Sequence, residues 1–150
     1  MNNPTIVIEN IKEEDLDEII QIGLTTPELQ VAEESPGYYP KEMLESFIQS
    51  PDDIYLVAKI DGKIAGYRIA TYNKYMKEAY LSDIVVKPEY RGHGVATKLY
   101  EKTFEILNKK KCYWIWALVR DTNTNMSGIL QKKGFHKGEK FNFFYKLPPF

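Results

Sequence analysis

One segment constrains the fold of this chain more than any other: a β-rich run stops at a proline and leads, through two glycines, into a helical pattern. The run is Ala79–Val86, the proline is Pro88, and Gly92 and Gly94 precede apolar residues at helical spacing up to Asn108. Proline stops a strand because it has no N–H to donate. The segment therefore predicts a buried strand, a short turn and a helix within an α/β fold.

The turn between this strand and this helix is suited to binding phosphate. The first N–H groups of a helix have no partner within the helix and lie at the positive end of its dipole. Glycine at 92 and 94 removes the Cβ atoms that would hold an anion away from the backbone, and Arg91 adds a guanidinium that matches phosphate. A hydrogen bond to a charged oxygen contributes about 1.5–3 kcal/mol and the dipole only about 0.3–1 kcal/mol, so the N–H groups dominate. A plain tight turn is the alternative.

Two other phosphate-binding motifs do not fit the same residues. Gly92-His93-Gly94 begins like a dinucleotide fingerprint, but Thr97 stands where a third small residue is required, and no acidic residue ends a strand some 20 residues later. The Gly-Lys-Ser/Thr ending of the Walker motif is absent as well.

The rest of the chain predicts an α/β fold with one mixed, mostly antiparallel sheet flanked by helices, in a single domain over residues 1–150. Asp61-Gly62 is a strong two-residue hairpin signal, and the dense apolar run 113–119 suggests a strand buried on both faces. The predicted order is β α α β β β α β α β β, with strands at Thr5–Glu9, Ile54–Ile60, Lys63–Thr71, Ala79–Val86, Tyr113–Val119, Phe135–Lys140 and Asn142–Leu147, and helices at Asp15–Leu24, Lys41–Gln49, Gly94–Asn108 and Asn123–Lys133.

Composition excludes several classes of protein. The net charge of −1 gives no bulk attraction to nucleic acid or to an anionic membrane, and no apolar run approaches the length of a membrane span. One cysteine, Cys112, allows no intrachain disulfide, and His93, His136 and Cys112 offer no metal-ligand spacing. We therefore expect a cytoplasmic protein without a metal, with neither nucleic acid nor membrane as partner. An exposed edge strand would allow two copies of the chain to pair as a homodimer.

The segment Arg91-Gly92-His93-Gly94-Val95-Ala96, preceded by Val86-Lys87-Pro88, resembles the signature of the GNAT family of N-acetyltransferases. A second family signature is an Asn after the next strand, followed eleven residues later by Gly-Phe, and Asn123 and Gly134-Phe135 match it. The resemblance covers nearly the whole chain. It implies the GNAT fold, acetyl-CoA as acetyl donor, and a primary amine of a small molecule or peptide as acceptor.

The resemblance also implies which residues hold the cofactor. The backbone of Ile84, Val85 and Val86 would pair with the pantetheine arm like an added strand, where the fourth and fifth strands of the family splay apart. Asn123 would contact the arm from its far side, and Leu130 lies on the adjoining helix. The pyrophosphate would be bound by Arg91, Gly92, His93, Gly94, Val95, Ala96 and Thr97.

The expected reaction is direct attack of the amine on the thioester, with a backbone N–H near Ile84 or Val85 stabilising the oxyanion. Many family members place a tyrosine where this chain has Leu130, as proton donor to the leaving thiolate. Ser127, Tyr100 or Tyr145 could donate instead, or the thiolate could leave unprotonated. Ser127 as an ordinary surface serine is an equal alternative.

The candidates for the general base lie on the strand before the glycines. Asp83 and Tyr80 point to opposite faces of that strand, whereas Tyr80 and Ser82 share a face. Tyr80 stands where relatives carry a carboxylate, so we favour a base that acts through water. Asp83 as a structural carboxylate is the alternative, and Glu33 and Glu34 of the irregular loop 25–40 are further candidates.

Tyr38 and Tyr39 of the same loop are the candidates for the acceptor pocket, because the family builds that pocket partly from this loop. The sequence does not identify the amine. The rival hypothesis is a CoA-binding module of the same fold without turnover.

Overall fold

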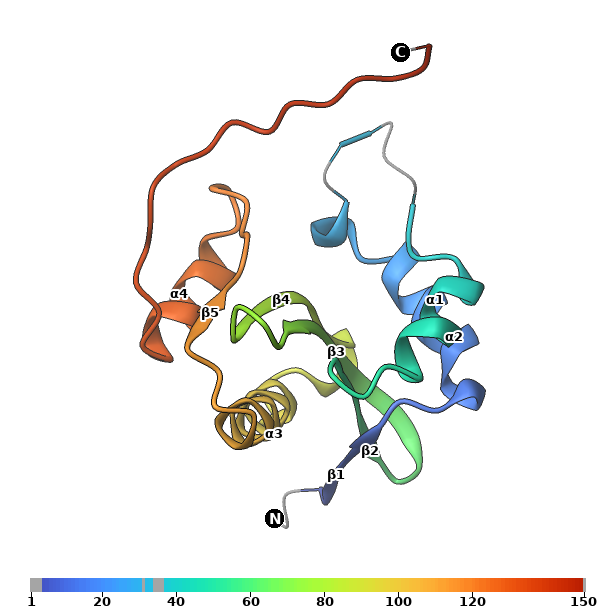
Figure 1. Ribbon diagram of the computed structural model, residues 1–150. Helices are drawn as coiled ribbons and strands as arrows, with labels where there is room; N and C mark the ends of the chain where they lie inside the picture. The colour runs from blue at the N-terminus through green and yellow to red at the C-terminus, as the bar shows by residue number, and fades with distance from the viewer. Residues whose placement is uncertain (1–3, 31, 34–36, 150) are drawn as a thin grey trace. The chain divides into compact units, whose positions relative to one another are not determined.

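A five-stranded sheet in the order β1-β2-β3-β4-β5 organises the larger of two units of this chain (Figure 1). The computed structural model describes residues 4–30, 32–33 and 37–149, and the units are Met1–Leu118 and Val119–Phe150. The strands through β4 run antiparallel to their neighbours, whereas β5 runs parallel to β4, so the predicted mixed and mostly antiparallel sheet is confirmed. The strands are β1 (Ile6–Asn10), β2 (Ile54–Ile60), β3 (Lys63–Asn73), β4 (Glu78–Val86) and β5 (Trp114–Trp116).

Helices cover both faces of this sheet (Figure 1). Helices α1 (Leu16–Leu24) and α2 (Lys41–Ile48) share one core with alternate residues of β2 and β3, among them Val57 and Tyr67. Helix α3 (Val95–Lys109) packs on β1 to β4, and its buried side chains, such as Leu99 and Tyr100, cover the other face. Successive strand residues point to opposite faces, so neighbouring residues of β3 belong to different cores.

The hairpin between β2 and β3 forms as its turn residues predict. Asp61 has φ 50° and Gly62 has φ 75°, which is the left-handed pair of a tight two-residue turn. The turn fixes the register, because Ile60 pairs with Lys63 directly beside it.

Three strand predictions at the C-terminal end differ from the structure. The fifth strand covers only Trp114–Trp116 rather than 113–119, and it is not buried on both faces, since Trp114 is 57% exposed. Residues 136–149 contain neither of the two predicted strands and are exposed. Aromatic residues such as Phe141 and Phe143 favour strands, but a strand exists only where a neighbouring strand supplies the ladder of hydrogen bonds.

The second unit contains helix α4 (Thr124–Lys132), one residue shorter at each end than the predicted Asn123–Lys133, and these two residues are its caps. Asn123 caps its start by accepting a hydrogen bond of 3.1 Å from the N–H of Met126. Gly134 follows its end with φ 87°, and the N–H of Phe135 donates to the carbonyl of Leu130, an arrangement typical of glycine-terminated helices.

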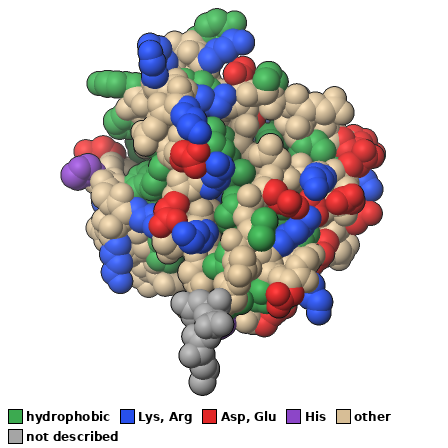
Figure 2. Space-filling model, turned by 90° about the horizontal axis from the view of Figure 1, so that it is seen from below, with side chains coloured by type: hydrophobic (Ala, Val, Ile, Leu, Met, Phe, Trp, Pro, Cys, Tyr) green, Lys and Arg blue, Asp and Glu red, His purple; other side chains and the backbone are tan. Residues whose placement is uncertain are grey.

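The surface carries mixed charges on the face drawn in Figure 2, where lysines and arginines lie among aspartates and glutamates. Within the described ranges, no helix is long and apolar enough to cross a membrane.

Candidate active site

The strand β4 has an open edge. Its pairing with β3 runs from Glu78 to Val86, but among the described residues its pairing with β5 covers only Glu78, Ala79 and Tyr80. Beyond Tyr80 the two parallel strands therefore separate. We call residues 81–86, on the side away from β3, the open edge of β4. An unpaired edge presents N–H and C=O groups to any extended ligand.

The direction of these groups follows from two hydrogen bonds. The N–H of Lys87 donates to the carbonyl of Ala65 in the chain of β3, whereas the carbonyl of Val86 accepts from Nε of Arg91, on the other side. Backbone groups of successive strand residues alternate in direction. The N–H and C=O of Ile84 and Val86 thus face the open edge, and those of Val85 face β3.

A bulge interrupts β4 beside this edge. Ile69 pairs with Asp83 and Ala70 pairs with Leu81, so Ser82 is an extra residue in β4. Its hydroxyl donates to the carbonyl of Ile69 at 3.1 Å.

The bulge changes which side chains share a face. Ile69 and Thr71 point to the same face of β3 and pair with Asp83 and Tyr80, so these two side chains also share a face. The prediction that Asp83 and Tyr80 point to opposite faces is therefore wrong, because the extra residue Ser82 shifts the alternation by one.

The turn that follows β4 has the backbone that phosphate binding requires. Gly92 has φ 78° and Gly94 has φ 85°, and a Cβ atom built on either residue meets no other atom within 4 Å. The space in front of both glycines is therefore open. Gly94 is the N-cap of α3 and supplies no side-chain cap, which leaves the N–H groups of the first turn available to a ligand. The residues present fit a pyrophosphate.

The seven predicted pyrophosphate-binding residues all lie in this turn or the first turn of α3. Arg91, Gly92, His93, Gly94 and Thr97 are exposed, Ala96 is half-buried, and Val95 is buried against β3 beside Gly66. Gly66 permits this contact, because a Cβ atom there would lie 3.3 Å from Cγ1 of Val95, and it would also lie 2.4 Å from the carbonyl oxygen of Val85. Val95 thus anchors the helix rather than facing a ligand.

A buried carboxylate lies on the α1/α2 face of β4. Asp83 is 6% exposed, and its Oδ2 accepts a hydrogen bond of 2.9 Å from the hydroxyl of Tyr38. The hydroxyl of Tyr67 lies 3.0 Å from that of Tyr38. We call Tyr38, Tyr67 and Asp83 the carboxylate cluster. It brings together a predicted base and a predicted acceptor-pocket residue.

Burial sets the protonation of this cluster. Desolvation raises the pKa of Asp83 above its ordinary range, against the opposing effects of the hydrogen bond from Tyr38 and of the charge of Arg68. Desolvation and the charge of Asp83 also raise the pKa of Tyr38 far above its ordinary value, so this phenol stays protonated and remains a donor. Asp83 is thus a stronger base than a surface carboxylate.

Tyr39 lies beside the cluster and extends it into an aromatic row. Its ring is 4.8 Å from that of Tyr38 and 6.1 Å from that of Phe47, which stacks on Tyr55 at 5.6 Å. Burial and the charge of Asp83 raise the pKa of Tyr39 to about 12. The two predicted acceptor-pocket tyrosines therefore form a wall beside Asp83.

Tyr80 marks the point where β4 and β5 separate. It is the last residue of β4 paired with β5, and its ring packs on that of Trp116 at 4.4 Å. Burial and the charge of Asp83 raise its pKa, so its hydroxyl is protonated and can donate.

The remaining predicted residues include four in the second unit. Asn123, Ser127 and Leu130 lie in the second unit, where Asn123 uses its side-chain oxygen to cap α4. Tyr145 is exposed in the same unit. Tyr100 is a buried residue of α3 whose ring faces the guanidinium of Arg68. Glu33 is exposed, and Glu34 lies outside the described residues.

Three residues of the cluster's surroundings were not found by sequence reasoning. Tyr67 and Arg68 lie in β3 as ordinary members of an alternating strand, so only the structure shows that Tyr67 contacts Tyr38 and that Arg68 contacts Asp83. Gly23 was placed in the first helix, but the contact that it permits is new: a Cβ atom there would lie 2.5 Å from the ring of Tyr38. A glycine inside an apolar helix face is the one signal that could have indicated this close approach.

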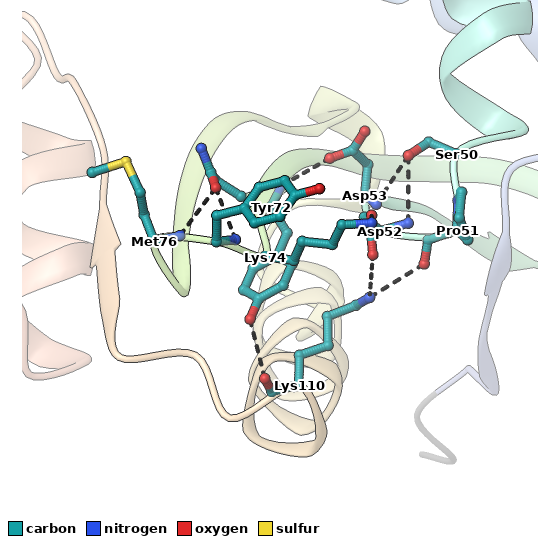
Figure 3. Close-up of polar contacts among 10 residues, drawn as sticks. Ser50, Pro51, Asp52, Asp53, Tyr72, Lys74, Met76 and Lys110 are labelled. Atoms are coloured by element: carbon teal, nitrogen blue, oxygen red, sulfur yellow. Dashed lines mark hydrogen bonds and ion pairs between the residues drawn. The ribbon is translucent and has the colours of Figure 1, made fainter.

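A separate surface hollow of about 320 Å³ lies at the far end of β3 and β4 (Figure 3). Its charged groups pair with one another: Nζ of Lys74 is 3.5 Å from Asp52, and Nζ of Lys110 is 3.9 Å from Asp52. Nζ of Lys110 also donates to the carbonyl of Pro51. Tyr72 links the start of β2 to the end of α3, because its N–H donates to Asp53 and its hydroxyl donates to the carbonyl of Lys110. These contacts tie the β3–β4 hairpin to α3. The hollow is lined by Asp52, Thr71, Tyr72, Asn73, Lys74 and Tyr75.

No group of three or more His, Cys, Asp and Glu side chains suited to a metal ion occurs in the part of the chain that the structure describes.

Comparison with known proteins gives consistent matches. The model of the acetyltransferase (GNAT) family matches residues 24–135. A putative [ribosomal protein bS18]-alanine N-acetyltransferase of Bacillus subtilis (strain 168) is 26% identical over 134 residues, which cover 87% of this chain and 81% of the relative.

Two solved structures share the fold. The ribosomal-protein-S18-alanine N-acetyltransferase from Escherichia coli matches with a TM-score of 0.71 and 23% identity, over 90% of this chain and 80% of the other. AAC(6')-Iy, in complex with the bisubstrate analog CoA-S-monomethyl-acetylneamine, matches with a TM-score of 0.76 and 20% identity, over 96% and 99%.

Proposed function

Because this chain belongs to the acetyltransferase (GNAT) family, we propose that it transfers the acetyl group of acetyl-CoA directly to a cationic primary amine held beside Asp83. The chain is an acetyl-CoA-dependent N-acetyltransferase, and its relatives are enzymes rather than binding modules. The observation that supports the proposed arrangement is the open edge of β4, which runs from the carboxylate cluster to the glycine turn. A bisubstrate analog bound to AAC(6')-Iy is in keeping with direct transfer.

The two ends of the open edge would hold the two ends of the cofactor. The N–H groups of residues 92–97 and Arg91 would bind its pyrophosphate, and the backbone of Ile84 and Val86 would pair with its pantetheine arm. Val85 contributes no backbone group to this pairing, because its own groups face β3. When bound, acetyl-CoA supplies a thioester whose carbonyl carbon accepts a nucleophile. The N–H of Ile84 would stabilise the negative charge that develops on the carbonyl oxygen.

The carboxylate cluster would remove the proton that makes the amine unreactive. At neutral pH an alkylammonium is more than three pKa units from its nucleophilic form. Asp83 would accept one proton from the ammonium through a water molecule, while Tyr38 fixes the carboxylate. The amine nitrogen then forms a bond to the carbonyl carbon, the C–S bond breaks, and the sulfur leaves with its electron pair. The nitrogen releases its second proton to water as the amide forms. Tyr80, protonated and close to the point of strand separation, would donate the proton that this sulfur takes; Ser127 is the other candidate.

The charge of the first helix and loop supports a cationic acceptor. The segment 13–40 contains no lysine or arginine, and three lysines from elsewhere, Lys41, Lys59 and Lys87, pair with it. Such a field concentrates cations and raises their association rate. The segment has eight acidic residues: Glu13, Glu14, Asp15, Asp17, Glu18, Glu28, Glu33 and Glu34.

A thiol-release assay over a panel of amines tests this function. The panel contains a polyamine, an aminoglycoside, a peptide with N-terminal alanine, and an acidic peptide of the same length. We expect release with the cationic amines, little with the acidic peptide, and a kcat/KM that falls as salt screens the acidic segment. Binding of CoA without release for any amine would contradict the proposal and favour the binding module.

The same proposal includes the domain organisation, the location and the partners of the enzyme. We propose one catalytic domain over residues 1–150, located in the cytoplasm, with neither nucleic acid nor membrane as partner. A homodimer would use an edge strand such as β1, which pairs only with β2 among the described residues. Sedimentation equilibrium distinguishes monomer from dimer.

A further inference from the structure

Arg68 is a buried cation whose position in the core is energetically costly. It is 1% exposed, and its guanidinium carbon lies 4.4 Å from the centre of the Tyr100 ring of α3. Among the described residues its Nε and Nη2 atoms have no hydrogen-bonding partner. Burying a charged group with unsatisfied donors destabilises a fold, and an apolar residue of similar volume at such a position is often neutral or stabilising. Fold stability alone therefore does not account for an arginine here.

Arg68 reaches the backbone of β4 through a hydrogen bond. Its Nη1 atom donates to the carbonyl oxygen of Asp83 at 3.3 Å. This carbonyl lies at the bulge, where Ser82 is the extra residue and the regular ladder is interrupted. Arg68 and Tyr67 point to opposite faces of β3. Asp83 is thus held from two sides, by Tyr38 at its carboxylate and by Arg68 at its carbonyl.

The planar peptide unit carries this contact to the open edge. A trans peptide places its C=O and its N–H in opposite directions. The carbonyl of Asp83 faces β3 and Arg68, so the N–H of Ile84, which belongs to the same peptide unit, faces the open edge. A cation at the carbonyl withdraws electron density and makes the N–H a stronger donor, because linked hydrogen-bonding groups polarise one another.

We propose that Arg68 is a positioning residue for acetyl transfer: its guanidinium fixes and polarises the Asp83–Ile84 peptide, whose N–H is the oxyanion donor. This inference rests on the proposed function, in which the N–H of Ile84 contacts the thioester oxygen. The contribution of Arg68 belongs to the transition state, since the charge on that oxygen develops only there.

Kinetics of Arg68→Met test the proposal, with Arg68→Lys as the variant that retains the charge. For Arg68→Met we expect kcat to fall about 10-fold or more, while KM for acetyl-CoA and the Kd of CoA stay within about twofold. The melting temperature should stay level or rise. Arg68→Lys should recover part of kcat. A purely structural role predicts the reverse: a lower melting temperature, weaker CoA binding, and a loss of activity that follows the folded fraction.

A spectroscopic measurement separates this inference from the proposed function. The backbone amide of Ile84, labelled with ¹⁵N, should move upfield in Arg68→Met when no substrate is present, because the polarising charge is gone. If the wild-type enzyme acetylates no amine but the Ile84 signal shifts, the proposed function fails and the polarisation stands. An unshifted Ile84 signal, or an unchanged kcat, overturns the inference. If Arg68→Met does not fold, Arg68→Gln, which lacks the charge but keeps a donor, is measured instead, and a wild-type kcat in that variant is equally decisive.

Discussion

Tyr38 and Asp83 are 45 residues apart in the sequence, and the hydroxyl of the first donates a hydrogen bond of 2.9 Å to the carboxylate of the second. The contact joins the irregular segment before α2 to the strand that carries the open edge. Because a phenol has one proton, Tyr38 gives it to Asp83, and its oxygen can accept from Tyr67. The position of the loop and the protonation of the carboxylate therefore depend on each other.

Tyr38→Phe removes the donor and keeps the ring. The hydrogen bond from Tyr38 lowers the pKa of Asp83, so its loss raises that pKa, and the acid limb of kcat/KM should move to higher pH. Stability should fall by about 1–3 kcal/mol, because a buried carboxylate oxygen loses its partner. Urea unfolding and a pH–rate profile measure the two effects. Tyr55→Phe is the matched control, since the buried hydroxyl of Tyr55 has no partner to lose among the described residues; equal destabilisation by both variants would contradict the assignment.

Asp83→Asn should separate stability from activity. Burial raises the pKa of Asp83 in the folded state above its unfolded value, so the folded state holds its proton to higher pH. Between the two pKa values the folded state binds more protons, and wild-type stability falls as pH rises. The introduced asparagine does not titrate, so the stability of the variant does not fall with pH for this reason. Its stability relative to wild type should therefore increase from about pH 4 to pH 7 while its acetyl transfer at neutral pH is lost. Unfolding curves at both pH values measure this relative stability. A relative stability that declines as pH rises would show that folding lowers the pKa of Asp83 instead.

The elements that local chemistry determines were predictable from the sequence. Asp61-Gly62 sets its own turn, and Gly92 and Gly94 adopt the left-handed backbone that their position before a helix requires. The separation of β4 from β5 was known only through the family resemblance, because the sequence of β4 gives no sign of where its second partner ends. The bulge at Ser82 and the burial of Arg68 depend on residues far apart in the chain. The C-terminal strands were predicted wrongly for the same reason: residues 135–147 have strand propensity, but propensity supplies no partner.

Gly23→Ala tests whether the loop tyrosine must lie against α1. A Cβ atom at residue 23 would lie 2.5 Å from the ring of Tyr38, so that ring must move. Alanine favours a helix over glycine by about 1 kcal/mol, hence the fold should persist. We expect kcat/KM to fall, with the acid limb shifted in the same direction as in Tyr38→Phe.

Gly128→Ala is the control for that variant. Gly128 also lies inside a helix, and a Cβ atom there meets nothing within 4 Å. It should gain the helix propensity without a change in kcat/KM. Wild-type kinetics in Gly23→Ala would show that Tyr38 has no fixed role in the reaction.

Gly94→Glu places a carboxylate in the path of the pyrophosphate. The backbone at residue 94 is left-handed, so the substitution also strains the chain. Gly62→Glu separates the two effects: Gly62 has a similar φ and equally open surroundings, but lies in the β2–β3 hairpin. In wild type and in Gly62→Glu, CoA at 100 times its Kd should stabilise the protein by about 2.7 kcal/mol, measured as a thermal shift. In Gly94→Glu the shift should vanish while the melting temperature without ligand matches that of Gly62→Glu. A full CoA-dependent shift in Gly94→Glu would mean that the pyrophosphate binds elsewhere.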